Sequence, residues 1–297
     1  MKDGWRERGE LGSLAGLLFM RWVALSLGRP LARLSLYPAV AWYLVKARRE
    51  QRYVRDFLRR VLPRPPRFRD VARTYWNFGA VTLDRVFMLA GRDDALDVGV
   101  HGAGPLLELQ EQGRGAILVG AHLGSFEAMR ALGLHRRALD IRVLQYVDQN
   151  PLLMRVFADV NPGLADAIIP LGTPDVMLRV GETVERGGFA AVLADRVGPG
   201  DPRSMPCRFL GGTARFATGA LEAALVLGCP VLFFAGLYRG GKRYDLHFEV
   251  LSGGERPPRR DREREVRRLA GRYAECLERY ARSAPYNWFN IYSYWED

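Results

Sequence analysis

The chain has 297 residues and a formal net charge of +11, and it is 48% hydrophobic and 26% charged. This composition excludes a disordered, collagen-like or purely coiled-coil protein and allows a sizeable core. Three cysteines, Cys207, Cys229 and Cys276, lack the spacing of a disulfide framework or a zinc site, so we expect a reducing compartment and no metal.

The positive charge is confined to the first quarter of the chain. Residues 1–73 hold 17 Lys/Arg and 6 Asp/Glu, which gives +11, whereas residues 74–297 hold 27 of each. These basic residues alternate with the most apolar sequence of the chain, while a nucleic-acid-binding protein usually spreads them over a folded face. We therefore expect an anionic membrane surface as a partner, and no nucleic acid.

Two apolar stretches, 11–28 and 34–45, lie in this basic segment. Arg21 falls near the middle of the first, and a charged residue at the bilayer centre costs about 2.5–3.5 kcal/mol, which disfavours a spanning helix. We predict an amphipathic, apolar helical hairpin in the membrane interface. The alternative is a helix packed on the protein's own core. The predicted membrane contacts are Arg21, Trp22, Arg29, Arg33 and Trp42.

A basic helix at 46–60 is followed by Pro63, Pro65 and Pro66, which predict a boundary. We expect a membrane-associating segment at 1–66 and an α/β domain at 67–297. The expected helices of this domain are 67–90, 105–112, 125–134, 151–160, 174–186, 215–227 and 260–282, and its expected strands are 96–101, 115–121, 141–146, 167–170, 189–195, 230–238 and 244–251. Their alternation predicts a mixed, largely parallel sheet flanked by helices, with an antiparallel hairpin at one edge.

Active sites in such sheets lie beyond the carboxyl ends of strands. His122 follows the buried strand at 115–121, and Glu127 comes after a Leu-Gly-Ser-Phe turn that opens a helix capped by Ser125. This turn can place the Glu127 carboxylate against one imidazole nitrogen and leave the other as a general base. His135 and Asp140 have the same spacing, but they lie at a helix end that we expect to be solvated.

The run at 115–133, GAILVGAHLGSFEAMRALG, resembles the catalytic block of the lysophospholipid acyltransferase superfamily, and is most similar to the bacterial lipid A late acyltransferases. Further pieces agree in order and spacing, and with the basic, apolar N-terminus the resemblance covers nearly the whole chain. These pieces are Asn150-Pro151 after a strand, Asp195-Arg196 at a strand end, Arg208-Phe-Leu-Gly before a helix, and the aromatic tail Tyr-Asn-Trp-Phe at 286–289.

The resemblance implies transfer of a fatty acyl group from acyl carrier protein or coenzyme A to a hydroxyl of a membrane lipid or glycolipid. It also implies a bacterial inner membrane location, on the cytoplasmic face, with no cofactor and no acyl-enzyme intermediate. His122 would deprotonate the acceptor hydroxyl, and Glu127 would fix the tautomer of His122 and stabilise its imidazolium. The residues that would position substrate or the oxyanion are Asp195, Arg196, Ser125, Asn150 and Arg208, although Asp195 fits equally well as a cap of its loop.

Two departures leave the acceptor open. Residues 156–162 lack the arginine that lipid A enzymes tend to carry after the Asn-Pro segment, and Arg196 stands where an acidic or amide residue is more usual. The acceptor is therefore either a lipid A precursor or another hydroxylated lipid, such as a glycolipid or an aryl-polyene product. Two other functions stay open: a non-catalytic lipid-binding or scaffold protein of the same fold, and a lipid thioesterase or other hydrolase.

Overall fold

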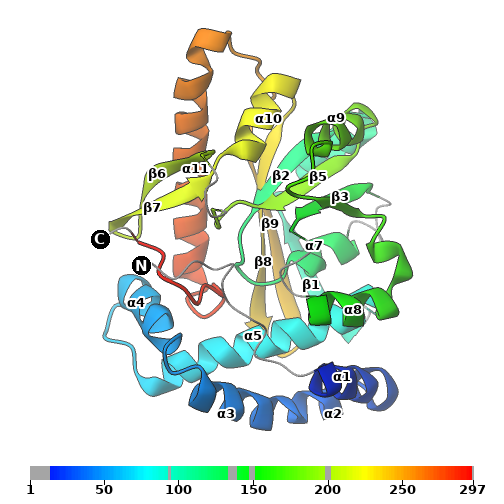
Figure 1. The fold of residues 1–297 in the computed structure, drawn as a ribbon, viewed down its shortest axis with the longest axis vertical. Coiled ribbons are helices and arrows are strands. Elements are labelled where there is room, and N and C mark those ends of the chain that lie inside the picture. Colours follow the sequence, from blue (N-terminus) through cyan, green and yellow to red (C-terminus); the bar gives the residue numbers. More distant parts are fainter. Residues whose placement is uncertain (1–13, 93–94, 133–138, 147–150, 198–201, 296–297) are drawn as a thin grey trace.

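The computed structural model describes residues 14–92, 95–132, 139–146, 151–197 and 202–295. A seven-stranded sheet in the order β1-β9-β8-β2-β5-β3-β4 forms its centre, and β6 and β7 form a separate two-stranded sheet (Figure 1). The strands are β1 (Asp97–His101), β2 (Ala116–Gly120), β3 (Ile141–Gln145), β4 (Ile168–Pro170), β5 (Phe189–Leu193), β6 (Ser204–Phe209), β7 (Gly212–Ala217), β8 (Val231–Gly240) and β9 (Arg243–Ser252).

The α-helices surround this sheet and are named here in chain order. They are α1 (Leu14–Leu27), α2 (Arg29–Leu34), α3 (Leu36–Lys46), α4 (Gln51–Val61), α5 (Phe68–Leu89), α6 (Gly104–Glu111), α7 (Phe126–Leu132), α8 (Pro151–Val160), α9 (Val176–Glu185), α10 (Gly219–Leu227) and α11 (Arg262–Ser283).

Helices cover both faces of the sheet. Successive residues of β2 alternate between two hydrophobic cores: Ile117 lies in one with residues of α10 and α11, and Leu118 lies in the other with residues of α5. All five residues of β2 are buried, as expected for a central parallel strand. The strand pairs β2–β5, β2–β8, β3–β4, β3–β5 and β1–β9 are parallel, and β8–β9 is antiparallel. The predicted mixed, largely parallel sheet flanked by helices is confirmed.

Two local predictions were wrong. The β8–β9 hairpin does not form the edge, because β1 pairs in parallel with β9 and lies outside it. Residues 204–217 form the hairpin of β6 and β7, so the helix predicted from residue 215 begins only at Gly219. The hairpin turns at Leu210 and Gly211, whose φ angles of 50° and 80° match the positive φ that two-residue hairpin turns require.

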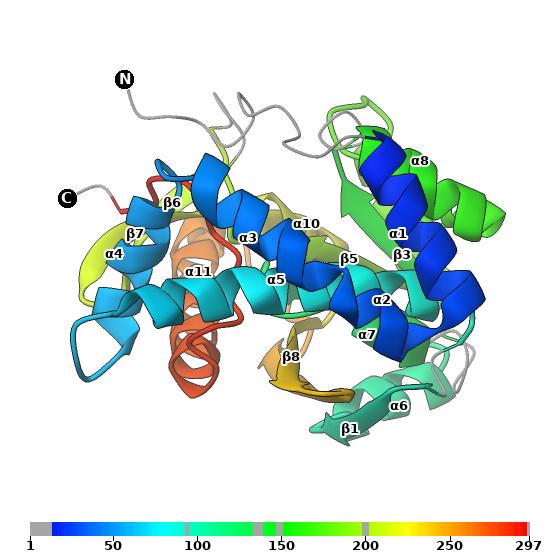
Figure 2. The ribbon, with the colours of Figure 1, turned by 90° about the horizontal axis from the view of Figure 1, so that it is seen from below.

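The N-terminal helices pack on the long helix α5 (Figures 1 and 2). Figure 2 shows α1 and the line of α2 and α3 diverging from their junction at Gly28. Among the described helices, none is both long and apolar enough to cross a bilayer. Val23, Ala24, Ala32 and Leu36 are buried in the same core as residues of α5. The segment therefore packs on the protein's own core, and the structure lends no support to a separate membrane hairpin.

The arginines predicted to contact the membrane are instead paired within the protein. Arg21 forms an ion pair with Asp159 of α8 at 2.8 Å. Arg33 donates a hydrogen bond of 2.7 Å to the carbonyl of Gly241, in the turn between β8 and β9. These arginines are thus held by the protein itself, and their contact with a membrane stays a prediction.

Arg29 makes the strongest of these connections, to the carboxylate of Asp84 on α5. Its Nε and Nη2 donate to the two Asp84 oxygens at 2.7 and 2.8 Å, and the hydroxyl of Tyr244 on β9 donates to the same carboxylate at 2.8 Å. Asp84 has no exposed surface. A buried carboxylate is tolerated only when it is paired and hydrogen-bonded, so Asp84 fixes α2 against both α5 and the sheet.

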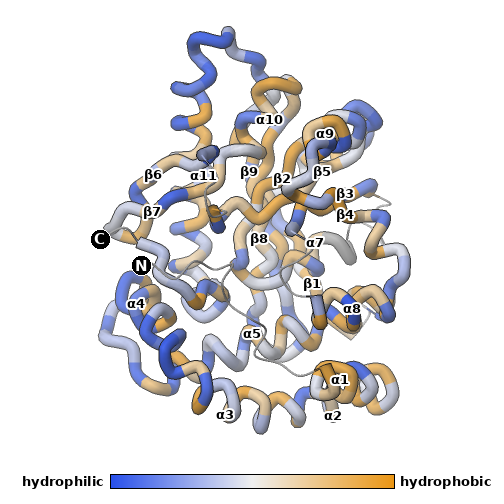
Figure 3. Tube along the Cα trace, viewed as in Figure 1, coloured by the Kyte–Doolittle hydropathy of each residue, from blue (hydrophilic) through white to orange (hydrophobic). Residues whose placement is uncertain are grey.

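The outward side of α1, α2 and α3 is apolar. Trp22 and Trp42, both predicted membrane contacts, are 56% and 44% exposed. The other large exposed apolar residues of these helices are Phe19, Leu27, Leu31, Leu34, Tyr37 and Val45. We call these eight residues the outer apolar face. Figure 3 shows hydrophobic residues along α1 and α3 at this border of the molecule.

We expect Arg29→Ala to lower the free energy of unfolding by about 3 kcal/mol, because it removes both charged hydrogen bonds to the buried Asp84 and, among the described residues, leaves only Arg33, at 3.9 Å, as a nearby cation. The matched control is Arg21→Ala, whose partner Asp159 is half exposed and whose loss should cost about 0–1 kcal/mol. Urea unfolding of the three proteins measures both effects. Equal shifts of the unfolding midpoint in the two variants would contradict the role assigned to Asp84.

Candidate active site

Two neighbouring strands bring His122 and Asp195 together. β2 and β5 pair in parallel with Gly120 opposite Leu193, and each of the two side chains follows its strand by two residues. The carboxyl ends of parallel strands meet at one edge of the sheet. The Nδ1 atom of His122 lies 2.8 Å from Oδ1 of Asp195.

The Asp195 carboxylate is buried and accepts several hydrogen bonds. Its Oδ2 accepts from the backbone N–H of His122 at 3.1 Å and from the indole N–H of Trp288 at 3.0 Å. Burial raises the pKa of Asp195. This effect is outweighed by three neighbours that lower the pKa: His122 by its charge and hydrogen bond, Arg196 by its charge, and Trp288 by its hydrogen bond. The pKa of Asp195 therefore lies below its usual value, and the group is ionised at neutral pH.

His122 is neutral at the same pH. Burial lowers the pKa of its imidazole below 6.5, the nearby charge of Arg196 lowers it further, and Asp195 raises it only in part. Because an ionised carboxylate can only accept, the ring proton lies on Nδ1. The unprotonated Nε2 is then the free nitrogen of a side chain that lines a cavity.

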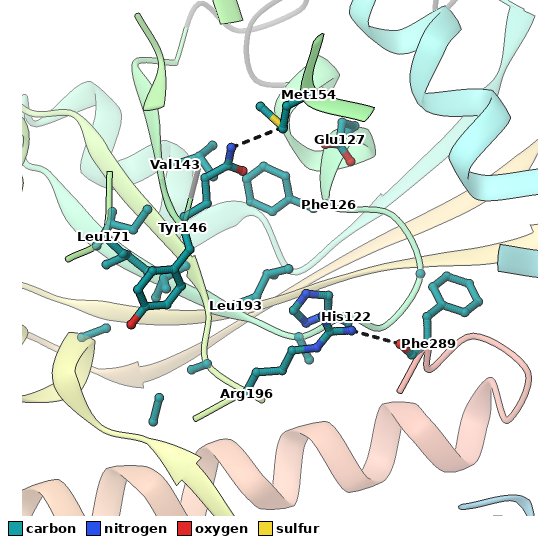
Figure 4. Close-up of a pocket in the computed structure, with 18 of the residues that line it drawn as sticks. His122, Phe126, Glu127, Val143, Tyr146, Met154, Leu171, Leu193, Arg196 and Phe289 are labelled. Carbon is teal, nitrogen blue, oxygen red and sulfur yellow. Dashed lines mark hydrogen bonds between the residues drawn. The ribbon is translucent and has the colours of Figure 1, made fainter. Parts of the chain in front are cut away.

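Glu127 does not make the contact predicted for it. Its carboxylate lies in the first turn of α7 and accepts a hydrogen bond from Nη2 of Arg85, a residue of α5. Arg85 also lies over the ring of Phe157, 4.7 Å from its centroid. Figure 4 shows His122 beside Arg196 and Glu127 set apart from both. The prediction of a His122–Glu127 pair was therefore wrong. In the described part of the chain, the carboxylate that contacts the imidazole is that of Asp195. The Glu127 carboxylate pairs with Arg85 instead.

A cavity of about 1090 Å³ adjoins these residues. Its polar lining includes His122, Glu127, Arg85 and Arg196, and most of the other lining side chains are apolar (Figure 4). Small-molecule pockets usually measure about 300–1,000 Å³, so this one has room for a long apolar ligand. The N-terminal helices contribute Leu17, Tyr43 and Ala47 to its wall, and the C-terminal tail contributes Phe289, Ile291 and Tyr292.

The other predicted site residues separate into two groups. Arg196 lines the cavity, and its Nη2 donates to the carbonyl of Phe289 at 3.1 Å. Ser125 is buried, and its Oγ accepts from the N–H of Ala128 at 3.2 Å, which confirms the predicted cap of α7. Arg208 is exposed on β6, away from the residues that line the cavity, because strand alternation turns its neighbour Phe209 inward. Asn150 lies outside the described residues.

Two site residues have no motif of their own in the sequence. Arg85 enters the site only because α5 packs against α7, a contact that the sequence does not reveal. Trp288 is visible in the sequence only as part of an aromatic tail. The one local signal for Arg85 is a charged pair, Asp84-Arg85, in the mostly apolar second half of α5.

The site combines a neutral histidine, a buried carboxylate that contacts it, and a large apolar cavity at the carboxyl ends of parallel strands. This arrangement is expected of an α/β enzyme that uses a general base on an apolar substrate. The family of bacterial lipid A biosynthesis acyltransferases matches residues 9–297, and the chain belongs to this family. The resemblance noted in the sequence is confirmed. No curated protein matches the chain significantly. Membership makes the protein an acyltransferase of lipid biosynthesis, with an acyl donor and a lipid acceptor.

We expect Asp195→Asn to change the tautomer of His122. Two donors, the N–H of His122 and the indole of Trp288, point at Oδ2, so the asparagine oxygen should take that position and its NH₂ should face Nδ1. The ring proton then moves to Nε2, which can no longer act as a base.

Two-bond ¹H–¹⁵N correlation spectra distinguish the tautomers, and a pH titration should give a pKa for His122 below 6.5 in the parent protein. An unchanged Nδ1–H tautomer in the variant would contradict the assigned hydrogen bonds.

Proposed function

We propose that the protein transfers a fatty acyl group from an acyl thioester, of acyl carrier protein or coenzyme A, to a hydroxyl of a membrane lipid or glycolipid. The observation that carries this proposal is the His122–Asp195 pair on the wall of an apolar cavity. Family membership supports acyl transfer to a lipid, and the donor and acceptor named here are part of the proposal.

The reaction begins when Nε2 of His122 takes the proton of the acceptor hydroxyl. The acceptor oxygen attacks the thioester carbonyl, a C–O bond forms, and a tetrahedral oxyanion results. The C–S bond then breaks, and the imidazolium returns its proton to the departing thiolate. Asp195 stabilises the imidazolium through Nδ1–H, and Arg196 supplies positive charge in the same cavity for the oxyanion.

Glu127 acts in this scheme as a positioning residue. It holds the guanidinium of Arg85 at the cavity wall, where Arg85 offers further N–H donors to polar groups of a substrate. The charge of Arg85 also contributes to the lowered pKa of His122. Loss of Glu127 therefore displaces a cation beside the base without removing the base itself.

The cysteines favour direct transfer over an acyl-enzyme intermediate. None of the three, all of which lie in the described chain, lines the cavity. Burial raises the pKa of the Cys229 and Cys276 thiols to about 11, and it also raises the pKa of Cys207. Protonated thiols are poor nucleophiles, so the histidine is left to activate the acceptor.

The outer apolar face supports attachment to a membrane. The same helices that expose Phe19, Trp22 and Trp42 also line the cavity with Leu17 and Tyr43. An acceptor lipid could then reach the cavity without crossing water. We assign this face to the cytoplasmic surface of the bacterial inner membrane, with Trp22 and Trp42 at headgroup depth.

We expect His122→Ala to lower the rate of acyl transfer by about 100-fold or more, the scale of a general base. Asp195→Asn should show a comparable loss, and Glu127→Gln a smaller one. Cys207→Ser, a half-buried residue away from the cavity, is the control and should transfer at the parent rate.

Initial rates with acyl carrier protein or coenzyme A thioesters and extracted lipid measure these effects, with circular dichroism melting as the check on folding. Near-parental transfer by folded His122→Ala protein refutes the proposed base. Release of free fatty acid without an acceptor identifies a hydrolase, and no turnover of any thioester favours a binding protein.

We expect the double substitution Trp22→Ser, Trp42→Ser to weaken binding to phosphatidylglycerol vesicles about tenfold or more. Burying one large apolar side chain is worth roughly 1.5–3 kcal/mol, and a tenfold change needs only about 1.4 kcal/mol. Leu178→Ser is the control, because Leu178 of α9 is 64% exposed but lies outside the outer apolar face. Vesicle sedimentation measures the binding of the parent, the double variant and the Leu178→Ser control. Equal binding by these three proteins would rule out the outer apolar face as the membrane contact.

A further inference from the structure

A cluster of metal-ligating side chains lies where β1 and β9 pair, outside the active site. His101 stands opposite His247, and Gly99 stands opposite Asp245. The two imidazoles stack with their centroids 4.7 Å apart. The ligand atoms of His101, Asp245 and His247 all lie within 4.8 Å of one another.

Gly99 leaves open a space between two of these ligand atoms. A Cβ atom at this position would lie 3.2 Å from Oδ1 of Asp245 and 3.4 Å from Nε2 of His101, which are themselves 3.8 Å apart. Ligand atoms around a tetrahedral ion with bonds of about 2.0–2.2 Å lie roughly 3.3–3.6 Å from one another. The ligand atoms of His101 and Asp245 therefore need to close by only a few tenths of an ångström to share one ion. The stacked rings of His101 and His247 must in addition rotate, so that each directs a nitrogen at the same ion.

The surroundings of the cluster orient it and leave it incomplete. Nε of Arg239 donates to Oδ2 of Asp245 at 2.6 Å, which fixes the carboxylate and turns Oδ1 toward His101. Nε2 of His247 is buried and has no hydrogen-bond partner in the described part of the chain. A bound ion would supply such a partner. The charge of Asp245 offsets that of Arg239, and the charge of Glu249 on the same strand offsets that of Arg279.

We propose that His101, Asp245 and His247 bind a first-row transition metal ion of the Zn²⁺ type. Imidazole nitrogens favour Zn²⁺, Co²⁺, Ni²⁺ or Cu²⁺, whereas Mg²⁺ and Ca²⁺ prefer oxygen ligands. Three protein ligands leave a fourth coordination position for water. Because the ligands come from both strands, a bound ion would also hold the edge strand β1 against β9. The expectation of no metal rested on cysteine spacing, which says nothing of ligands that strand pairing brings together. The site is independent of the proposed acyl transfer.

The test titrates the full chain, freed of metal with a chelator, with Zn²⁺ by calorimetry and with Co²⁺ by visible absorption. We expect saturable binding at this site with a Co²⁺ spectrum of low coordination number, and a rise in melting temperature with Zn²⁺. Loss of a neighbour that merely orients a ligand typically costs about 10–100-fold in metal affinity, so His101→Ala and Asp245→Asn should each cost at least tenfold.

Gly99→Ala gives a second test that leaves every ligand in place. Its added methyl group fills the space between Asp245 and His101, so metal affinity should fall while the fold in chelator is retained. His122→Ala removes a described histidine that lies outside the cluster and should bind metal as tightly as the parent does. The proposal is overturned if the parent shows no saturable binding in the micromolar range, or if His101→Ala and Gly99→Ala bind as tightly as the parent.

Discussion

The buried carboxylate of Asp195 is the interaction on which the rest of the site depends. An ionised carboxylate in the protein interior costs several kcal/mol unless its oxygens are hydrogen-bonded, and three donors from two distant segments meet this need. The tail is also bound to the loop after β2, since Gly124 N–H donates to the carbonyl of Asn287 and Phe289 N–H donates to that of His122. The segment 287–289 therefore helps to hold the histidine in place, so its packing on the loop after β2 is coupled to the chemistry.

The sequence allowed the strand that carries His122 to be predicted, because a continuous apolar run followed by a Gly-Ser turn has few other structural interpretations. The partner of His122 could not be found in the same way. Spacing along the chain pointed to Glu127, whereas the contact is set by the pairing of β2 with β5, which brings in Asp195 from a distant segment. Local spacing identified a residue of the site but assigned it to the wrong neighbour.

Two other differences have causes of different kinds, one in a local turn and one in long-range packing. The β6–β7 hairpin was missed because its turn places Leu210, a non-glycine residue, at positive φ, which sequence patterns rarely predict. The N-terminal arginines were assigned to lipid because apolar and basic residues alternate there. The pairing of Arg29 depends on a single carboxylate, Asp84, in the C-terminal half of α5, and only the folded arrangement of α2 against α5 shows which cation that carboxylate meets.

The position of α1 has a mechanical consequence. It presents Leu17 to the cavity and Phe19 and Trp22 to the outside, so at this point a single layer of helix forms the partition between the two. Any force that shifts this partition changes the space for substrate directly, with no relay through the sheet.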